Sequence, residues 1–376
     1  MKIKPEVDEA KAKEYLQKLF GITAVQICEL NSYDDRNFLI HADKSIRNPH
    51  LKAVCADGYV LKILNSFDSK KIGFVEGQTA LSLYLKYLGN QKLVCPRQLP
   101  NVHGKHYSIE DGNVVRLYEF IPGKIFCDVT PSANLFYHAG VYLGKLNESL
   151  KNFKHDGYNN HKTLWMLSSV PHLEEFVPVV NEAQRGMVEN IIEQFQQRVM
   201  NNISEFQKQI IHGDFNEQNI LVGKKPGKDE YTVTGFIDYG DTQYNCLVFE
   251  IAVALCYMLL TTGEIEIGGY FLAGYKMTRL IPENEQKVLK VINAIVPNYT
   301  SNKTFIADSQ LCVCARLCQS LVLGLYSHKL DSCNEYLLTT QKAGWKLLEN
   351  LYSRTDDEVT NLWNAVADEY LTQSHK

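Results

Sequence analysis

Two kinds of hydrophobic pattern divide the chain. In the first third, short runs of β-branched and aromatic residues alternate with polar turns, which predicts strands over 23–30, 36–42 and 58–64. Apolar residues at helical spacing then predict a helix over 74–88. Two further strand-like runs, over 105–109 and 113–120, flank an Asp-Gly pair that favours a hairpin turn. This part of the chain is therefore predicted to be β-rich.

After the Pro122-Gly123 pair, the pattern becomes predominantly helical. Long amphipathic runs predict helices over 132–150, 182–206, 246–262, 283–296, 306–328, 335–352 and 356–371. The chain is thus expected to have an α+β, bilobal fold, with a small β-rich N-terminal lobe over residues 1–121 and a large helical C-terminal lobe over 122–376.

Composition narrows the possible partners. The 376 residues include 39 basic and 43 acidic side chains, and the formal net charge is −4 with no basic block. This argues against nucleic acid or an anionic membrane as partner, because both are bound mainly by clustered Lys and Arg. The longest apolar run, Val248–Leu260, contains Glu250 and is shorter than the roughly 20 residues of a bilayer span. The ten cysteines include no CxxC pair and most lie among apolar residues, which indicates reduced thiols. We expect a cytoplasmic protein with small-molecule partners.

Two polar clusters between apolar residues carry the strongest chemical signal. They are HGDFNEQNIL over 212–221 and GFIDYGD over 235–241. Asp214 and Asn219 have the five-residue interval of a kinase catalytic loop, and Asp238 begins a triplet of the D-F-G form. In such a site, Asp214 would accept the proton of a substrate hydroxyl, and the other two side chains would bind Mg²⁺ next to nucleotide phosphates. His212 is expected to be a scaffold residue that bonds backbone in this loop.

A cation for the phosphates is available on the predicted strand 58–64. Lys62 shares a face with Val60 and Leu64, which is unusual for a lysine. On the next predicted helix, 14 residues later, Glu76 could hold the ammonium group in place. An arbitrary pair of this kind would more often be two solvated side chains, but the clusters downstream favour a functional pair.

The turn over 31–37 lies where a phosphate-covering turn is expected, yet it contains no glycine. Its backbone N–H groups and the Ser32 hydroxyl could donate to phosphate oxygens. Asp34 and Asp35 would repel a triphosphate unless they turn away or pair with Arg36. The turn could equally be capped by its own side chains, and as a third possibility Asp35 could reach a substrate ammonium group.

The two clusters resemble motifs of the aminoglycoside phosphotransferase and choline kinase superfamily, which has a protein-kinase-like fold. Five further segments extend the resemblance, to the narrower hydroxylysine kinase family: SYDDRNF at 32–38, YVLKI at 59–63, LYEFIPG at 117–123, VFEIAVA at 248–254 and RLCQSLV at 316–322. The resemblance implies Mg²⁺-dependent phosphoryl transfer from GTP to the hydroxyl of 5-hydroxy-L-lysine, which gives 5-phosphohydroxylysine and GDP. It also implies Asp214 as base, Asn219 and Asp238 as metal ligands, and Lys62 with Glu76 on the phosphates. No residue chemistry here selects guanine, so the GTP assignment comes from the resemblance alone and ATP remains possible.

A substrate with two ammonium groups and one carboxylate should meet charged side chains around its reactive hydroxyl. Asp241 could face an ammonium group or cap the following helix. Arg316, in an apolar helix, could bind the carboxylate or pair with Glu250, a buried acid that itself needs a partner.

Three further alternatives follow from the sequence. Trp165 and Trp345 could line the substrate site or belong to the core. The acceptor could be another amine alcohol, such as choline, ethanolamine, homoserine or an aminoglycoside, with ATP as donor. A non-catalytic, nucleotide-binding pseudokinase is the third hypothesis, although a pure scaffold has no physical need for Lys62, Asp214, Asn219 and Asp238 together.

Overall fold

The computed structural model describes residues 4–88, 93–224, 227, 229–279, 309–330, 338 and 340–374. The chain divides into two compact units. The first contains Met1–Gly123, His155–His161 and Gly235–Asp238, and the second contains Lys124–Lys154, Lys162–Thr234 and Tyr239–Lys376. The expected lobe boundary after residue 121 is close to the break after Gly123, but two later segments return to the first unit. The predicted helix over 283–296 lies outside the described residues.

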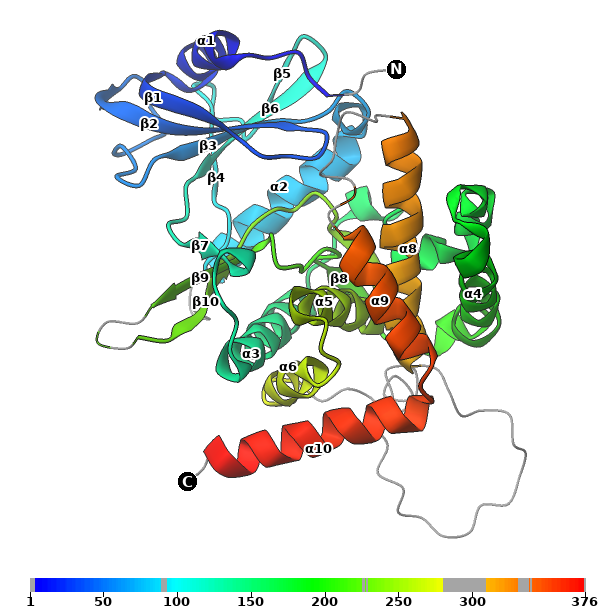
Figure 1. The fold of residues 1–376 in the computed structure, drawn as a ribbon. Coiled ribbons are helices and arrows are strands. Elements are labelled where there is room, and N and C mark those ends of the chain that lie inside the picture. The colour runs from blue at the N-terminus through cyan, green and yellow to red at the C-terminus, as the bar shows by residue number, and fades with distance from the viewer. Residues whose placement is uncertain are drawn as a thin grey trace. The chain divides into compact units, whose positions relative to one another are not determined.

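An antiparallel sheet forms the first unit, with the strand order β1-β2-β3-β6-β4 and β5 paired to β6 (Figure 1). Its strands are β1 (Ile22–Leu30), β2 (Arg36–Ile46), β3 (Tyr59–Ile63), β4 (Gln98–Leu99), β5 (Ser108–Glu110) and β6 (Asn113–Glu119). The helices of this unit are α1 (Glu9–Phe20) and α2 (Ile72–Tyr87). The β-rich character and the helix after the third strand are as the sequence predicted.

The two faces of this sheet bury different kinds of side chain. Tyr59, Leu61 and Ile63 alternate along β3 and join the apolar residues of α1 in one core cluster. Lys62 lies between them in sequence, so its side chain leaves the opposite face. Arg116 of β6 is its register partner, and α2 packs against this face, because Arg116 bonds to the Val75 carbonyl oxygen. The alternation thus places two cations beside each other on the α2 side of the sheet.

Helices make up most of the second unit. They are α3 (Ala133–Leu150), α4 (Glu182–Gln194), α5 (Leu247–Thr262), α6 (Ile267–Lys276), α8 (Ser309–Leu330), α9 (Gln341–Tyr352) and α10 (Asp356–Ser374). Short ladders join β8 (Lys208–Ile211) to β11 (Gln243–Cys246), and β9 (Ile220–Lys224) to β7 (Lys124–Ile125) and β10 (Tyr231–Phe236). Together with the first unit, this confirms the α+β class.

Two helical regions differ from the prediction. The run over 182–206 is not one helix: α4 ends at Gln194, and a π-helical turn over Phe195–Val199 and a 3₁₀ segment over Met200–Glu205 follow. Helix α6 was not predicted because it is rich in glycine, a poor helix former. A Cβ atom on its Gly274 would lie 1.9 Å from the carbonyl oxygen of Tyr137 in α3, so glycine permits close contact of the two backbones.

Helix α8 is long and apolar enough to cross a membrane by length and composition, over Leu311–Leu330. However, 78% of that stretch is buried inside the protein, which is the property of a core helix. Three buried thiols, those of Cys312, Cys314 and Cys318, lie on it. The nine described cysteines are free, and six of them are buried.

Candidate active site

The 212–219 loop of the second unit is fixed to the start of α5. Strand β8 leads into the loop, and its partner β11 leads directly into α5. Glu250, in the first turn of that helix, accepts the backbone N–H groups of His212 at 3.2 Å and Gly213 at 2.7 Å. Burial raises the pKa of Glu250, while these two hydrogen bonds oppose the rise. Glu250, which the sequence offered as a partner of Arg316, therefore holds the 212–219 loop.

Gly213 lets the loop pass close to the end of the second motif. Its φ is +81°, and a Cβ atom there would lie 2.3 Å from the carbonyl oxygen of Asp241. The ring Nδ1 of His212 accepts the backbone N–H of Asp214 at 3.3 Å, which confirms the predicted scaffold role. The first two residues of the motif thus shape the backbone for the third.

The carboxylate of Asp214 is held from three directions. Its Oδ2 accepts the side-chain amides of Asn216 and Asn219, each at 2.9 Å, and its Oδ1 lies 3.3 Å from Nη2 of Arg316. The Asn219 amide nitrogen also bonds to the Asp214 carbonyl oxygen at 3.0 Å. Among the described residues no donor reaches the Asn219 amide oxygen, so this hard oxygen suits a Mg²⁺ ligand.

Arg316 connects this loop to the helical core. The side chain is 2% exposed, and its Nη1 donates to the Trp165 carbonyl oxygen at 2.7 Å and to Gln319 Oε1 at 2.8 Å. The guanidinium lies 5.4 Å from the ring centre of Trp165 and 5.3 Å from that of Tyr257. Burial acts against its charge, but Tyr257 and Asp214 keep the pKa of Arg316 above its usual value. The expected pair with Glu250 is not formed, because the guanidinium binds the candidate base instead.

Two other predicted substrate contacts can be placed in the second unit. The N-cap position of α5 is Cys246, so Asp241 does not cap the next helix, which was one of its two expected roles. Its charge contributes to the raised pKa of Arg316, which places Asp241 near the catalytic loop. Trp165 contacts Arg316 through its ring and its carbonyl oxygen. Trp345 instead donates its Nε1–H to Gln341 within α9.

In the first unit, Lys62 is paired with aspartates and not with Glu76. Its Nζ lies 3.1 Å from Asp35 Oδ2 and 3.1 Å from both carboxylate oxygens of Asp238, which has a φ of +66°. Burial alone would lower the pKa of Lys62, but the two aspartates outweigh it and raise the pKa above its usual value.

The prediction that Lys62 pairs with Glu76 is therefore wrong. The position of Glu76 around the α2 helix axis explains why. Val75 and Gln78 occupy the face of α2 that meets the sheet, and both bond to Arg116. Glu76 comes one residue after Val75, about 100° further round the helix, and is exposed. It accepts a hydrogen bond from Tyr107 Oη at 3.3 Å instead.

The 31–37 turn is stabilised by its own side chains, which was one of the alternatives. Ser32 Oγ donates to the Asp35 carbonyl oxygen at 2.5 Å, so in the structure this hydroxyl serves the turn. Asp35 Oδ1 accepts the backbone and side-chain N–H groups of Asn65 at 2.8 and 3.2 Å. Both carboxylate oxygens of Asp35 thus have protein partners, Lys62 and Asn65, and its contact with a substrate ammonium group stays a prediction. Arg36 does not pair with the turn acids but with Glu29.

Asp34, the other aspartate of the turn, has an unusual electrostatic environment. Burial raises the pKa of Asp34 to about 7, and the charges of Asp35 and Asp68 act in the same direction. Lys62 opposes this effect only partly. The raised pKa disfavours the charged form of Asp34, which weakens the repulsion of phosphate that was expected of this acid.

Sequence reasoning missed several residues that the site uses. Asn65 anchors Asp35, Asn216 anchors Asp214, and Gln319 anchors Arg316. Asn216 lies inside the HGDFNEQNIL motif, between the candidate base Asp214 and the candidate metal ligand Asn219. This position is the one feature of the sequence that could have indicated its role. Asn65 and Gln319 have no such signal, because their partners come from distant parts of the chain.

The two units contain the parts of a kinase-like phosphotransferase. One has a lysine paired with aspartates on a six-stranded sheet, and the other has a loop in which Asn219 bonds to Asp214. The chain belongs to the phosphotransferase enzyme family, whose model matches residues 56–285. It is an enzyme that transfers a phosphoryl group to an alcohol group of a small molecule.

Similar proteins agree with this assignment. Hydroxylysine kinase from Bos taurus is 31% identical over 385 residues, which cover 98% of this chain and 95% of that protein. Hydroxylysine kinase from Mus musculus is 30% identical over 384 residues, with the same coverage. Among solved structures, a microcompartment-associated aminopropanol kinase has a TM-score of 0.63 at 13% identity, over 97% of this chain and 98% of that one. The structural likeness establishes the protein-kinase-like fold.

Proposed function

We propose that this enzyme transfers the γ-phosphoryl group of GTP to the hydroxyl of 5-hydroxy-L-lysine. The observation that carries the proposal is the similarity to hydroxylysine kinases along 98% of the chain. The guanine nucleotide rests on the sequence resemblance, and ATP is the alternative donor. A cytoplasmic location, proposed from composition, accords with a small soluble metabolite as substrate.

The residues of the catalytic loop supply the proton chemistry. Asp214 accepts the proton of the substrate hydroxyl while that oxygen forms its bond to the γ-phosphorus and the bond to the β-phosphate oxygen breaks, so that GDP leaves. The amides of Asn216 and Asn219 and the guanidinium of Arg316 fix the carboxylate before the substrate arrives. We propose Arg316 as a positioning residue, in addition to its predicted contact with the substrate carboxylate.

The charge of the donor phosphates requires cations. Lys62 supplies one, and its ion pairs with Asp35 and Asp238 keep it protonated and in place. A bound Mg²⁺ would neutralise phosphate charge, and the amide oxygen of Asn219 and the carboxylate of Asp238 are the ligands we propose for it. Carboxylate and amide oxygens are the donor types that this ion prefers.

A panel of acceptors and donors tests the proposal. Initial rates would be measured with 5-hydroxy-L-lysine, choline, ethanolamine, homoserine and an aminoglycoside, each with GTP and with ATP. We expect the highest kcat/KM for hydroxylysine, with GTP preferred. Turnover of another amine alcohol without turnover of hydroxylysine would contradict the proposed acceptor. Nucleotide binding without turnover of any acceptor would favour the pseudokinase hypothesis.

A further inference from the structure

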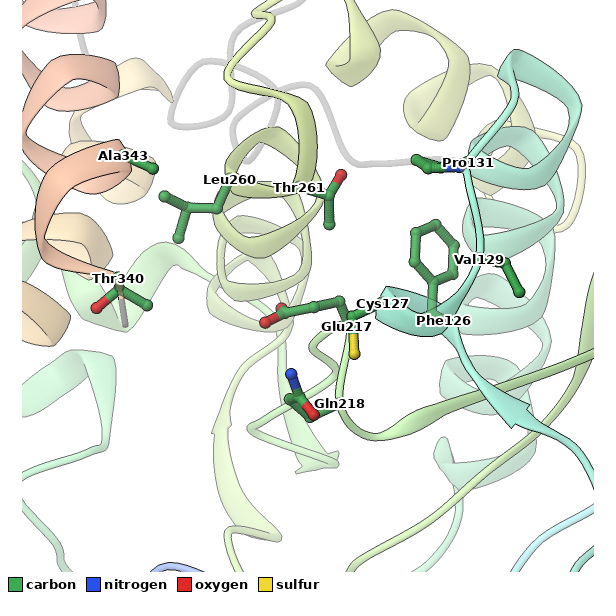
Figure 2. Close-up of a pocket in the computed structure, with 10 residues that line it drawn as sticks. All are labelled: Phe126, Cys127, Val129, Pro131, Glu217, Gln218, Leu260, Thr261, Thr340 and Ala343. Carbon is green, nitrogen blue, oxygen red and sulfur yellow. The ribbon is translucent and has the colours of Figure 1, made fainter. Parts of the chain in front are cut away.

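A pocket of about 270 Å³ opens beside the catalytic loop, within the second unit (Figure 2). Its lining comes from the loop itself, from the segment between β7 and α3, from the last turn of α5 and from the start of α9. Asp214 and Arg316 are not among the lining residues. The pocket is therefore a recess next to the candidate base and not the space around its carboxylate.

Glu217 is the chemically distinctive residue of this pocket. Figure 2 shows its side chain at the centre of the lining residues. Its Oε2 is buried and has no hydrogen-bond partner in the structure. The backbone is fixed, since the Glu217 carbonyl oxygen accepts the N–H of Cys127 at 3.3 Å. A buried carboxylate oxygen without a donor is costly, so this arrangement calls for a ligand that carries one.

The rest of the lining selects the charge of that ligand. Among the ten lining residues that the structure describes, Glu217 carries the one carboxyl group, and none is Lys, Arg or His. Leu260, Ala343 and Phe126 supply apolar walls, which suit a methylene chain. The Thr340 hydroxyl adds a polar group at the pocket wall. An aliphatic cation with hydrogen-bond donors fits these features.

We propose that this pocket binds the α-ammonium end of the acceptor, with Glu217 as its counter-ion. This inference rests on the proposed function. In hydroxylysine the second ammonium group lies on the carbon next to the hydroxyl-bearing one, so it must stay close to Asp214 during transfer. The α-ammonium is separated from the reacting carbon by two methylene groups. A carboxylate three residues further along the same loop, in a separate recess, is suited to this remote group.

Kinetics with a matched pair of acceptors test the assignment. The pair is 5-hydroxylysine and 6-amino-5-hydroxyhexanoate, which differ only in the α-amine. The Glu217→Gln variant is expected to raise the KM for hydroxylysine about tenfold, with a much smaller change for the analogue, because only the former loses an ion pair. Asp128→Asn, which removes an exposed carboxylate outside the lining, is the charge-matched control and should change neither KM.

The outcomes separate the possible roles of Glu217. An equal loss with both acceptors would assign Glu217 a structural role in the loop and overturn the inference, as would an unchanged KM for hydroxylysine. If the wild-type enzyme does not phosphorylate hydroxylysine at all, the proposed function is wrong. This failure appears with the wild type alone, so it can be distinguished from a failure of the role proposed for Glu217, which appears only in the variant. Should Glu217→Gln fail to fold, Ala343→Phe narrows the pocket from an exposed position of α9. It should also raise the KM for hydroxylysine, and an unchanged KM would contradict the proposal.

Discussion

At the scale of single residues, the site depends on carboxylates that have more than one partner. Asp35 binds Lys62 through one oxygen and Asn65 through the other, and it occupies the place that the sequence assigned to Glu76. The sequence could indicate that Lys62 has a chemical role, because a lysine on an inward strand face is unusual. It could not indicate the partner, because a one-residue difference in helix phase decides whether Glu76 or Val75 faces the sheet.

The pairing of Lys62 leads to a prediction about donor binding. Asp35→Asn removes one ion pair of the lysine, so we expect the donor KM to rise about tenfold, since charge-assisted bonds to a buried group are strong. Glu76→Gln is the comparison, and its exposed side chain should leave the donor KM nearly unchanged. Initial rates at varied GTP measure both. A large effect of Glu76→Gln with no effect of Asp35→Asn would show that Lys62 changes partners when nucleotide binds.

At the scale of elements, close backbone contacts account for what the sequence did not predict. Five of the six strands of the first unit, α2, and the helices α3, α5, α9 and α10 follow from hydrophobic period, which local sequence determines. Helix α6 does not, because its glycines serve contacts with other helices: Gly274 meets Tyr137 of α3, and Gly268 meets the Trp363 ring of α10. Glycine at these positions lowers helix propensity but permits close helix packing. The sequence shows the low propensity and does not show the packing.

The same physics gives a prediction for Gly213 in the catalytic loop. Gly213→Ala combines a left-handed φ with a Cβ atom 2.3 Å from a carbonyl oxygen. Gly263, at the C-terminal end of α5, has a φ of +76° but open space around the added atom, and so provides the control. We expect Gly263→Ala to cost about 1 kcal/mol of unfolding free energy. Gly213→Ala should cost about 1–3 kcal/mol more, the usual range for overpacking.

Chemical denaturation measures both free energies, and kcat should fall only for Gly213→Ala, since its loop carries Asp214. Equal costs for the two variants would contradict the close contact between the loop and Asp241.

At the scale of the whole molecule, the sequence predicts the class and order of the parts but not which segments fold together. Residues 155–161 lie in the helical half of the sequence yet pack in the first unit. There the Phe74 and His161 rings stack at 3.6 Å, and a Cβ atom on Gly157 would lie 1.9 Å from the Gly73 carbonyl oxygen. A short polar segment of this kind has no periodicity, so its docking site on α2 could not be predicted.

The candidate site shows the same division. Asp214, Asn219 and Asp238 were found because their spacing matches a known order of catalytic groups. The contacts of Arg316 and Glu250 with the catalytic loop were not predictable, because the chain brings them from α8 and α5. The sequence indicated each as a buried charge in need of a partner, and Arg316 also as a ligand of the substrate carboxylate. Burial indicates that such a group matters, but the fold decides what it binds.

The central claim is that Asp214 is the base of a hydroxylysine kinase. The most direct test measures phosphoryl transfer to 5-hydroxy-L-lysine and nucleotide affinity on the same preparations of wild type and Asp214→Asn. The account predicts that kcat falls by about 10²- to 10⁴-fold, the usual contribution of a positioned base, while the Kd for nucleotide remains nearly the same. An Asp214→Asn enzyme that retains wild-type turnover would contradict it.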